Sequence, residues 1–405
     1  MLAAIERDAP EAEVTIADIN STISVPERHG KQVGEGWLQN LQHFDVIIRS
    51  PGIPPQPALH AVKDKLTNTT QIFLDTVAGT GAVVIGITGS KGKSTTSSLI
   101  HHILQEGGRE SLLVGNIGEP AIAHIDAAKD GMIFVHEMSS YQLMDVHSSP
   151  AMAVITAFFP EHLDYHGSLD AYRDAKTNIG RFQEPEDVIF YDAASEGARM
   201  IAEESQGRKV PFTMNDCPVA IQETQLIGAH NLRNMGAAFL VARSLSIPVE
   251  TCISALRSFK PLPHRLQLVS EAKGIRWVDD AISTTPESAI AAIDALDGHV
   301  GSIILGGQDR GYDFAPLGER IAHSTIATVI LVPDSGTTIE AALRSAKAKA
   351  HIEHAPTMQE AVRLAALHTP KGTTCLLSPA SPSYNMFKNF EERGRVFAES
   401  IAALA

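Results

Sequence analysis

The sequence has 405 residues, of which 44% are hydrophobic and 20% charged, a composition that excludes a disordered or fibrous protein and allows two or three domains with separate cores. The formal net charge of -14, with no basic run, argues against nucleic-acid binding, and the lack of both a run of about 20 apolar residues and a signal peptide predicts a cytoplasmic protein that does not insert into membranes. Three separated cysteines outside any CxxC pair exclude a disulfide framework and a cysteine-rich zinc site.

The first block of the chain covers residues 1–78. Strand-like runs occupy residues 14–19 and 44–49, and the second run ends in a Ser-Pro-Gly turn at residues 50–52. A doubly wound domain normally opens with a strand and a glycine turn, whereas this block opens with a helical pattern. We therefore predict a partial domain here, with the start of the domain missing.

The second block, residues 79–262, opens with an apolar strand, a glycine turn and a helix that ends at Gly107. The turn differs in glycine spacing from the usual phosphate loop but keeps its chemistry, because backbone N–H groups at a helix N-terminus can surround phosphate oxygens. Lys93 would neutralise the β- and γ-phosphates, and the Ser94 or Thr95 hydroxyl would hold Mg²⁺. The alternative is a plain glycine turn with a surface lysine. The predicted loop residues are Gly89, Ser90, Lys91, Gly92, Lys93, Ser94 and Thr95.

Two polar segments follow later strands of this block. Glu137 ends one strand, where a hard cation beside the phosphates would favour carboxylate oxygen. The loop after the next strand contains Glu161, His162, Asp164 and His166, which allow a zinc site, but magnesium beside a phosphate loop is the simpler prediction, and ordinary loop polarity stays open. Lys176 lies on a predicted helix, and by spacing alone it is a solvated charge.

The third block, residues 263–405, alternates strands and helices and predicts a second parallel sheet. Arg265, Asp280, Arg310 and Ser383 fall in loops between the core elements. Such residues bind ligands or serve as helix caps and surface charges, and the sequence pattern leaves both open.

Taken together, these motifs resemble those of the Mur ligases, in particular the members that add glutamate. The resemblance covers nearly the whole chain and rests on these segments: GITGSKGKST, VGNIG, HEMSSYQL, PEHLD, YRDAK, LPHR, VDD and SPASPSYNMFKNFEERG. It implies an α/β, three-domain Mur ligase architecture. The domains would be a truncated Rossmann-like N-terminal domain, a central P-loop ATPase-like domain and a C-terminal Rossmann-like domain.

The resemblance also implies roles for individual residues. Lys93, Glu137, His162, Lys176 and Arg310 would be catalytic. Metal ligands would be Ser94, Glu137, His162 and Lys176, the last as the lysine that the family carbamylates. Asn231, Arg265 and Asp280 would contact adenine, phosphate and ribose. The substrate contacts would be Ser50, Gly52, Asn116, Ser139, Ser383, Tyr384 and Phe390.

By resemblance, the reaction uses ATP and two Mg²⁺ ions to convert the alanyl carboxylate of UDP-N-acetylmuramoyl-L-alanine to an acyl phosphate, which the amine of glutamate attacks. D-glutamate is the prevalent substrate of the family. Ile282 stands where the D-glutamate enzymes have a lysine, and the run ISTTP is similar to the subgroup that adds L-glutamate, whose product a partner epimerase inverts.

Two alternatives remain open on the sequence. One is an amide ligase of the folate-polyglutamating type, which the SPGI and VGNIG segments disfavour. The other is a nucleotide-binding remnant without catalysis, and the presence of Lys93, Glu137, His162 and Lys176 argues against it.

Overall fold

The computed structural model describes residues 1–296 and 298–404, which form an α/β protein. The chain divides into two compact units. One comprises residues 1–218 and 232–256, and the other comprises residues 219–231 and 257–405. No helix among the described residues is long and apolar enough to cross a membrane.

The N-terminal part of the first unit contains two small parallel sheets, β1 with β2 and β3 with β4. The predicted strand at residues 14–19 is confirmed, whereas the one at 44–49 shortens to two residues because it pairs only with the equally short β4. The elements are α1 (Leu2–Asp8), β1 (Thr15–Asp18), β2 (Gly30–Val33), β3 (Ile47–Ile48), α2 (Pro57–His60) and β4 (Leu66–Thr67).

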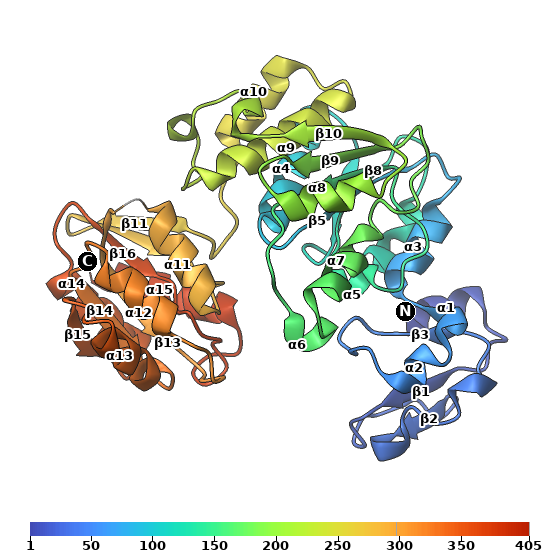
Figure 1. Cartoon of the computed structure of the whole chain (residues 1–405), viewed down its shortest axis with the longest axis horizontal. Coiled ribbons are helices and arrows are strands. Elements are labelled where there is room, and N and C mark those ends of the chain that lie inside the picture. Colours follow the sequence, from blue (N-terminus) through green and yellow to red (C-terminus); the bar gives the residue numbers. More distant parts are fainter. Residues whose placement is uncertain (297, 405) are drawn as a thin grey trace. The chain divides into compact units, whose positions relative to one another are not determined.

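A six-stranded sheet forms the core of the first unit, in the order β10-β9-β8-β5-β7-β6, and every neighbouring pair is parallel. Figure 1 shows β8, β9 and β10 as adjacent green arrows. The strands are β5 (Val83–Thr88), β6 (Ser111–Gly115), β7 (Ile133–Glu137), β8 (Met152–Ile155), β9 (Val188–Asp192) and β10 (Arg208–Phe212). Because helices cover both faces, β7 and β8 are buried along their whole length; β8 is apolar throughout, and β7 is apolar up to His136.

Several helices of this region have capping residues at their ends. The helix after the glycine turn ends at Glu106 with Gly107 as its cap, as predicted. The helices are α3 (Thr69–Val77), α4 (Lys93–Glu106), α5 (Ser140–Leu143), α6 (Leu163–His166), α7 (Leu169–Thr177), α8 (Glu196–Glu203), α9 (His230–Ser244) and α10 (Val249–Ser258).

The second unit contains a mixed six-stranded sheet in the order β11-β12-β16-β13-β14-β15. Its strands are β11 (Gln267–Ala272), β12 (Ile275–Asp279), β13 (Val300–Gly306), β14 (Thr328–Val332), β15 (His351–His354) and β16 (Thr374–Leu377). The predicted parallel pairing is confirmed for β12, β13, β14 and β16, whereas β11, a strand that the sequence did not predict, runs antiparallel to β12. Lys273 and Gly274 join these strands with positive φ angles, and a two-residue hairpin turn of this kind can connect only antiparallel strands.

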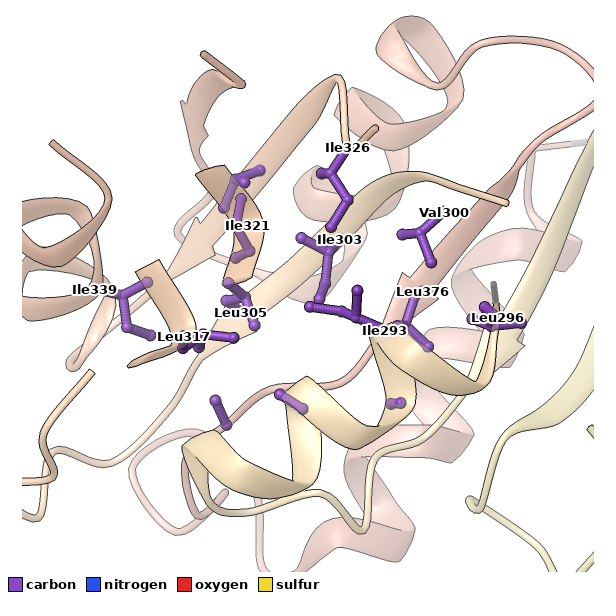
Figure 2. Packing of buried hydrophobic residues seen from close by; sticks show 14 of the residues in the cluster. Ile293, Leu296, Val300, Ile303, Leu305, Leu317, Ile321, Ile326, Ile339 and Leu376 are labelled. Carbon is purple, nitrogen blue, oxygen red and sulfur yellow. The ribbon is translucent and has the colours of Figure 1, made fainter. Parts of the chain in front are cut away.

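Alternate residues of this sheet enter two different cores. Ile303 and Leu305 of β13 pack with helices α11 (Pro286–Ala295), α12 (Ala315–Ala322) and α13 (Gly336–Ser345), as Figure 2 shows. Ile304 faces the opposite core, which includes residues of α14 (Met358–His368) and α15 (Phe390–Ala402). The period of two therefore places one helical layer on each face of the sheet.

Trp277 of β12 is the largest fully buried side chain of the described chain, with its ring 6.1 Å from that of Phe397. Replacement by alanine should lower the free energy of unfolding of the second unit by about 3 to 5 kcal/mol, because it removes apolar contacts and leaves a cavity. Calorimetric unfolding of wild type and Trp277→Ala measures this loss. Leu367→Ala, at a side chain that is 67% exposed, is the matched control and should change stability by less than about 0.5 kcal/mol. Equal losses in the two variants would contradict the assigned core.

Candidate active site

The glycine turn after β5 forms a loop whose shape depends on two glycines. Gly89 has φ +146°, and a Cβ there would lie 1.9 Å from Thr156 Oγ1. Gly92 has φ +91° and immediately precedes α4. The first N–H groups of α4 have no carbonyl partner inside the helix, so they are directed into this loop and can bind an anion.

Two lysines converge on one backbone carbonyl of this loop. Lys93 Nζ donates to the carbonyl oxygens of Gly89 at 2.9 Å and Ser90 at 3.0 Å. Lys176 Nζ donates to the same Gly89 oxygen at 2.8 Å and lies 3.3 Å from Thr88 Oγ1. The charge of Lys93 beside a helix N-terminus makes the loop attractive to a polyphosphate.

The interpretation of Lys176 as a solvated charge is wrong. Its side chain is 1% exposed, and Nζ lies 4.8 Å from the centre of the Tyr172 ring. Burial lowers the pKa of Lys176 well below its usual range, and the nearby Lys93 adds to this shift, whereas Glu161 and Glu137 oppose it. The amine therefore has an increased neutral fraction, and a neutral amine is a nucleophile.

The side chain of Ser90 anchors the loop. Its hydroxyl donates to the Phe159 carbonyl at 2.8 Å, accepts from the Phe159 N–H at 2.8 Å, and lies 2.9 Å from the Tyr172 hydroxyl. The Ser90 N–H also donates to the Ala157 carbonyl, so Ser90 holds the shape of the loop. Lys91 also has a protein partner, since it pairs with Glu161 at 2.8 Å.

Glu137, at the end of β7, has one carboxylate oxygen without a partner. Its Oε1 accepts from Asn116 Nδ2 at 2.8 Å, while Oε2 is buried and lacks a hydrogen-bond partner among the described residues. A buried, unpaired carboxylate oxygen is costly unless a ligand satisfies it, and hard cations prefer such oxygens. The donor set therefore fits magnesium, with Ser94 as a half-buried hydroxyl at the second position of α4. Thr95, by contrast, is buried.

The two histidines of the loop after β8 have different contacts. His162 has φ +56°, and its ring lies 5.0 Å from that of Tyr141. Burial lowers its pKa, which favours the neutral imidazole that metals bind. His166 instead lies 3.0 Å from Ser140 Oγ, and burial lowers its pKa to about 4. Among the described residues, these side chains form no group of three metal ligands, so the geometry does not favour zinc here.

The Ser-Pro-Gly loop that contains Ser50 and Gly52 is attached to α6 and to the segment after α5 by residues that the sequence did not predict. Arg49 Nε donates to Asp145 Oδ2 at 2.6 Å, and the Tyr165 hydroxyl lies 2.7 Å from the Pro51 carbonyl oxygen. A Cβ on Gly52 would meet nothing within 4 Å, so this side of the loop is open to a ligand.

Two predicted substrate contacts of the first unit have structural partners. Asn116 binds Glu137, as described, and also donates its backbone N–H to the Glu137 carbonyl at 2.9 Å. The Ser139 hydroxyl caps α5 together with Gln142 in a capping box. Their contacts with substrate stay predictions.

The remaining predicted ligand residues lie in the second unit. Asp280 is buried and accepts from Ser283 at 2.5 Å, Ser378 at 2.8 Å and the Leu266 N–H at 3.2 Å. Asn231 donates to the Ile227 carbonyl at 2.8 Å. Arg265 lies near enough to Asp280 to lower its pKa.

Arg310 and Tyr384 lie together, with the guanidinium 5.9 Å from the ring centre. Tyr384 is 62% exposed, whereas Ser383 is buried. Phe390 begins α15 and packs its ring edge-on to His264 at 6.1 Å.

A second buried network, which the sequence analysis did not predict, lies behind these residues. His264 Nδ1 is 2.7 Å from Asp279 Oδ2. Arg393 donates to the carbonyls of Ser381 at 2.9 Å and Ala281 at 2.8 Å. Burial lowers the pKa of Arg393 to about 10. These contacts fix the loop that follows Asp280 and the loop around Ser383. The one sequence signal for this network is Arg393. It lies four residues before buried Phe397 and therefore on the same face of the helix.

Asp280 should make stability depend on pH. Burial raises its pKa to about 6 from an ordinary 3.8, so between pH 4 and 6 the folded state binds a proton that the unfolded state has lost. The free energy of unfolding should therefore fall as pH rises through this window, by on the order of 3 kcal/mol. Asp280→Asn should remove this fall. Urea unfolding followed by Trp277 fluorescence in a Trp37→Phe background measures it, and identical pH profiles for the two proteins would contradict the assignment.

Comparison with known proteins agrees with this geometry. Residues 87–217 match the Mur ligase middle domain, and residues 264–381 match the Mur ligase glutamate ligase domain. The chain belongs to the Mur ligase family. It is 38% identical to the UDP-N-acetylmuramoyl-L-alanine--L-glutamate ligase of Salinispora tropica over 98% of this chain and 93% of that protein. It is 34% identical to the UDP-N-acetylmuramoylalanine--D-glutamate ligase of Symbiobacterium thermophilum over 92% of this chain and 87% of that protein.

Solved Mur ligases share the fold. The MurF ligase of Thermotoga maritima in complex with ADP aligns with a TM-score of 0.61 and 17% identity, covering 89% of this chain and 90% of that one. FolC of E. coli in complex with DHPP and ADP aligns with a TM-score of 0.59 and 15% identity, covering 83% and 93% of the two chains. The predicted Mur ligase architecture and the prediction of a ligase are confirmed.

Proposed function

We propose that this Mur ligase joins the amine of glutamate to the alanyl carboxylate of UDP-N-acetylmuramoyl-L-alanine, with conversion of ATP to ADP and phosphate. The observation that carries the proposal is the convergence of Lys93 and the buried Lys176 on the Gly89 carbonyl, at the N-terminus of α4. The names and full-length similarity of the curated relatives support the choice of substrates. We include in this proposal a division into three domains, with boundaries at residues 78/79 and 262/263, and a cytoplasmic location.

The chemistry of this reaction explains why these residues are needed. A carboxylate is a poor electrophile, so its oxygen must first take the γ-phosphoryl group of ATP, and negative charge then accumulates on the phosphoryl oxygens. The backbone N–H groups of the loop hold the phosphates, and Lys93 stabilises the developing charge. Attack by the neutral amine of glutamate on the acyl phosphate then forms the amide and expels phosphate.

Magnesium ions, proposed as two, would be held by Ser94, Glu137, His162 and modified Lys176. When bound, they neutralise phosphate charge and orient the phosphoryl group. The unpaired Oε2 of Glu137 is the structural support for this assignment.

We also propose that Lys176 is carbamylated. Its lowered pKa supports this, because the neutral amine can attack CO₂. The nitrogen lone pair forms the N–C bond, one C=O electron pair moves to oxygen, and the nitrogen loses a proton. The product is a carboxylate that offers oxygen to a cation, in place of an ammonium that repels it.

For the enantiomer of glutamate, we propose L. Two of the relatives, at 38% and 35% identity, are named as L-glutamate ligases. Half-buried Ile282, next to Asp280, offers no charge to a carboxylate, which leaves Arg310 beside Tyr384 as the proposed cation for the incoming amino acid. An L-glutamyl product would require an epimerase downstream wherever the D-configured peptide is needed.

The test is phosphate release by the purified protein with ATP, Mg²⁺ and UDP-N-acetylmuramoyl-L-alanine, with L- or D-glutamate in parallel. We expect release that depends on L-glutamate. Release with D-glutamate alone would reject the stereochemical proposal and retain the ligase. Release with neither enantiomer, or only with a pteroate acceptor in place of the UDP substrate, would reject the proposed function.

A further inference from the structure

The edge of the second sheet carries a group of histidines that the proposed reaction does not use. β15 is the last strand of this sheet and pairs only with β14 among the described residues. Its sequence, HIEH, alternates between the two faces. Ile352 packs into the core that contains α13, and His354 Nε2 lies 3.0 Å from Glu340 of α13. His351 and Glu353 consequently face the other side, where α14 lies.

His368, the last residue of α14, completes the group. His351 Nε2 lies 2.8 Å from Glu353 Oε1, and His368 Nε2 lies 3.3 Å from the same oxygen. The two imidazole rings are 5.3 Å apart. Each of the three residues offers one ligand atom, and all three atoms lie within 4.8 Å of one another.

These separations suit a small cation. Zinc binds histidine nitrogen and carboxylate oxygen at about 2.0 to 2.2 Å, which places the ligands of a tetrahedral site roughly 3.3 Å apart. Two of the atom pairs are at or near this separation, so a shift of about 1.5 Å in one imidazole would complete the set. The nearest guanidinium on α14, that of Arg363, is held by Glu360 at 2.7 and 2.8 Å. Among the described residues, Glu353 is thus left with His351 as a hydrogen-bond partner and His368 as an ion-pair partner.

We propose that His351, Glu353 and His368 bind one divalent transition-metal ion, with Zn²⁺ as the best match. Two imidazoles favour zinc, nickel or copper over Mg²⁺, which prefers oxygen ligands. Three protein ligands leave a fourth position open to water. The ion would link β15 to the end of α14, and the site is independent of the proposed ligase function.

The test is a calorimetric titration of the metal-stripped, full-length protein with ZnCl₂ in excess Mg²⁺. We expect the wild type to bind one equivalent of Zn²⁺ at this site. His351→Ala and His368→Ala should each lower the affinity for this Zn²⁺ by at least about tenfold. Zinc that binds at the phosphate loop would contribute equally to the titrations of all these proteins. Glu353→Gln, which keeps the side-chain shape, should also lower the zinc affinity of this site. It replaces an alanine variant in the test if that variant does not fold.

His354→Ala is the matched control, because this histidine lies on the same strand and pairs with a glutamate on the opposite face. It should bind Zn²⁺ like the wild type. Zn²⁺ should also raise the unfolding temperature of the wild type and His354→Ala, but not of the His351 and His368 variants. Equal zinc affinity in all the proteins, or no binding to the wild type at millimolar Zn²⁺, would overturn the site.

Discussion

Lys93→Ala should reduce ATP-dependent phosphate release by at least about a thousandfold. Lys93 Nζ lies within 3.0 Å of the carbonyls of Gly89 and Ser90, in the turn before α4, where a γ-phosphate would bind. A cation positioned on the transferring phosphoryl group is typically worth this factor or more. Steady-state phosphate release with all substrates saturating measures the loss.

Lys129→Ala is the control for this variant. Lys129 is exposed and pairs with Glu110 at the surface, so its removal should leave the rate within twofold of wild type. Circular dichroism must show that both variants are folded. A Lys93→Ala protein with more than a tenth of the wild-type rate would reject the assignment of the phosphate loop.

Lys176→Ala should reduce the rate by at least about a hundredfold, and a short carboxylate such as propionate should restore part of it. The reason is that the variant removes the proposed carbamate and leaves a space beside Gly89 and Thr88 that a small anion can enter. Rates measured against propionate concentration give the rescue.

Rescue separates a carbamate from a structural lysine. Propionate should not accelerate the wild type or Lys93→Ala, and Lys176→Arg should stay inactive because a guanidinium does not form a carbamate. Full activity of Lys176→Arg would show that a positive charge suffices and would reject carbamylation.

The phosphate loop was predictable from sequence because its determinants are local. An apolar strand, two glycines and a helix with a lysine at its start occupy one short segment, and the structure has each of them in place. The same holds for Glu137, which directly follows buried strand residues.

Lys176 was not predictable on physical grounds from its own helix. Its neighbours Arg173 and Asp174 are polar, and the burial of Lys176 results from residues that approach from β5 and the phosphate loop. The side-chain partners of Ser90 and Arg49, and Ser378 as a partner of Asp280, are likewise distant in sequence. Arg49 and Asp145, for example, are 96 positions apart, and no spacing rule relates them.

The pairing of the strands could also be predicted from the sequence only in part. The alternation of strands and helices predicts parallel pairing, but it does not reveal that β11 and β12 form a hairpin. The two positive φ angles at Lys273 and Gly274 decide that pairing, and the KG dipeptide is a weaker signal for such a turn than NG or DG.

The position of β5 between β7 and β8 has a consequence for synthesis of the chain on the ribosome. β5 emerges before both of its neighbours, so neither edge can pair until β7 has been made through Glu137, and the second edge waits until β8 has been made through Ile155. The loop itself waits longer, because the Ser90 N–H binds the Ala157 carbonyl and the Ser90 hydroxyl binds Phe159. During translation, at least one edge of the apolar segment Val83–Thr88 is therefore open to chaperones and to aggregation for the time needed to synthesise about the next seventy residues.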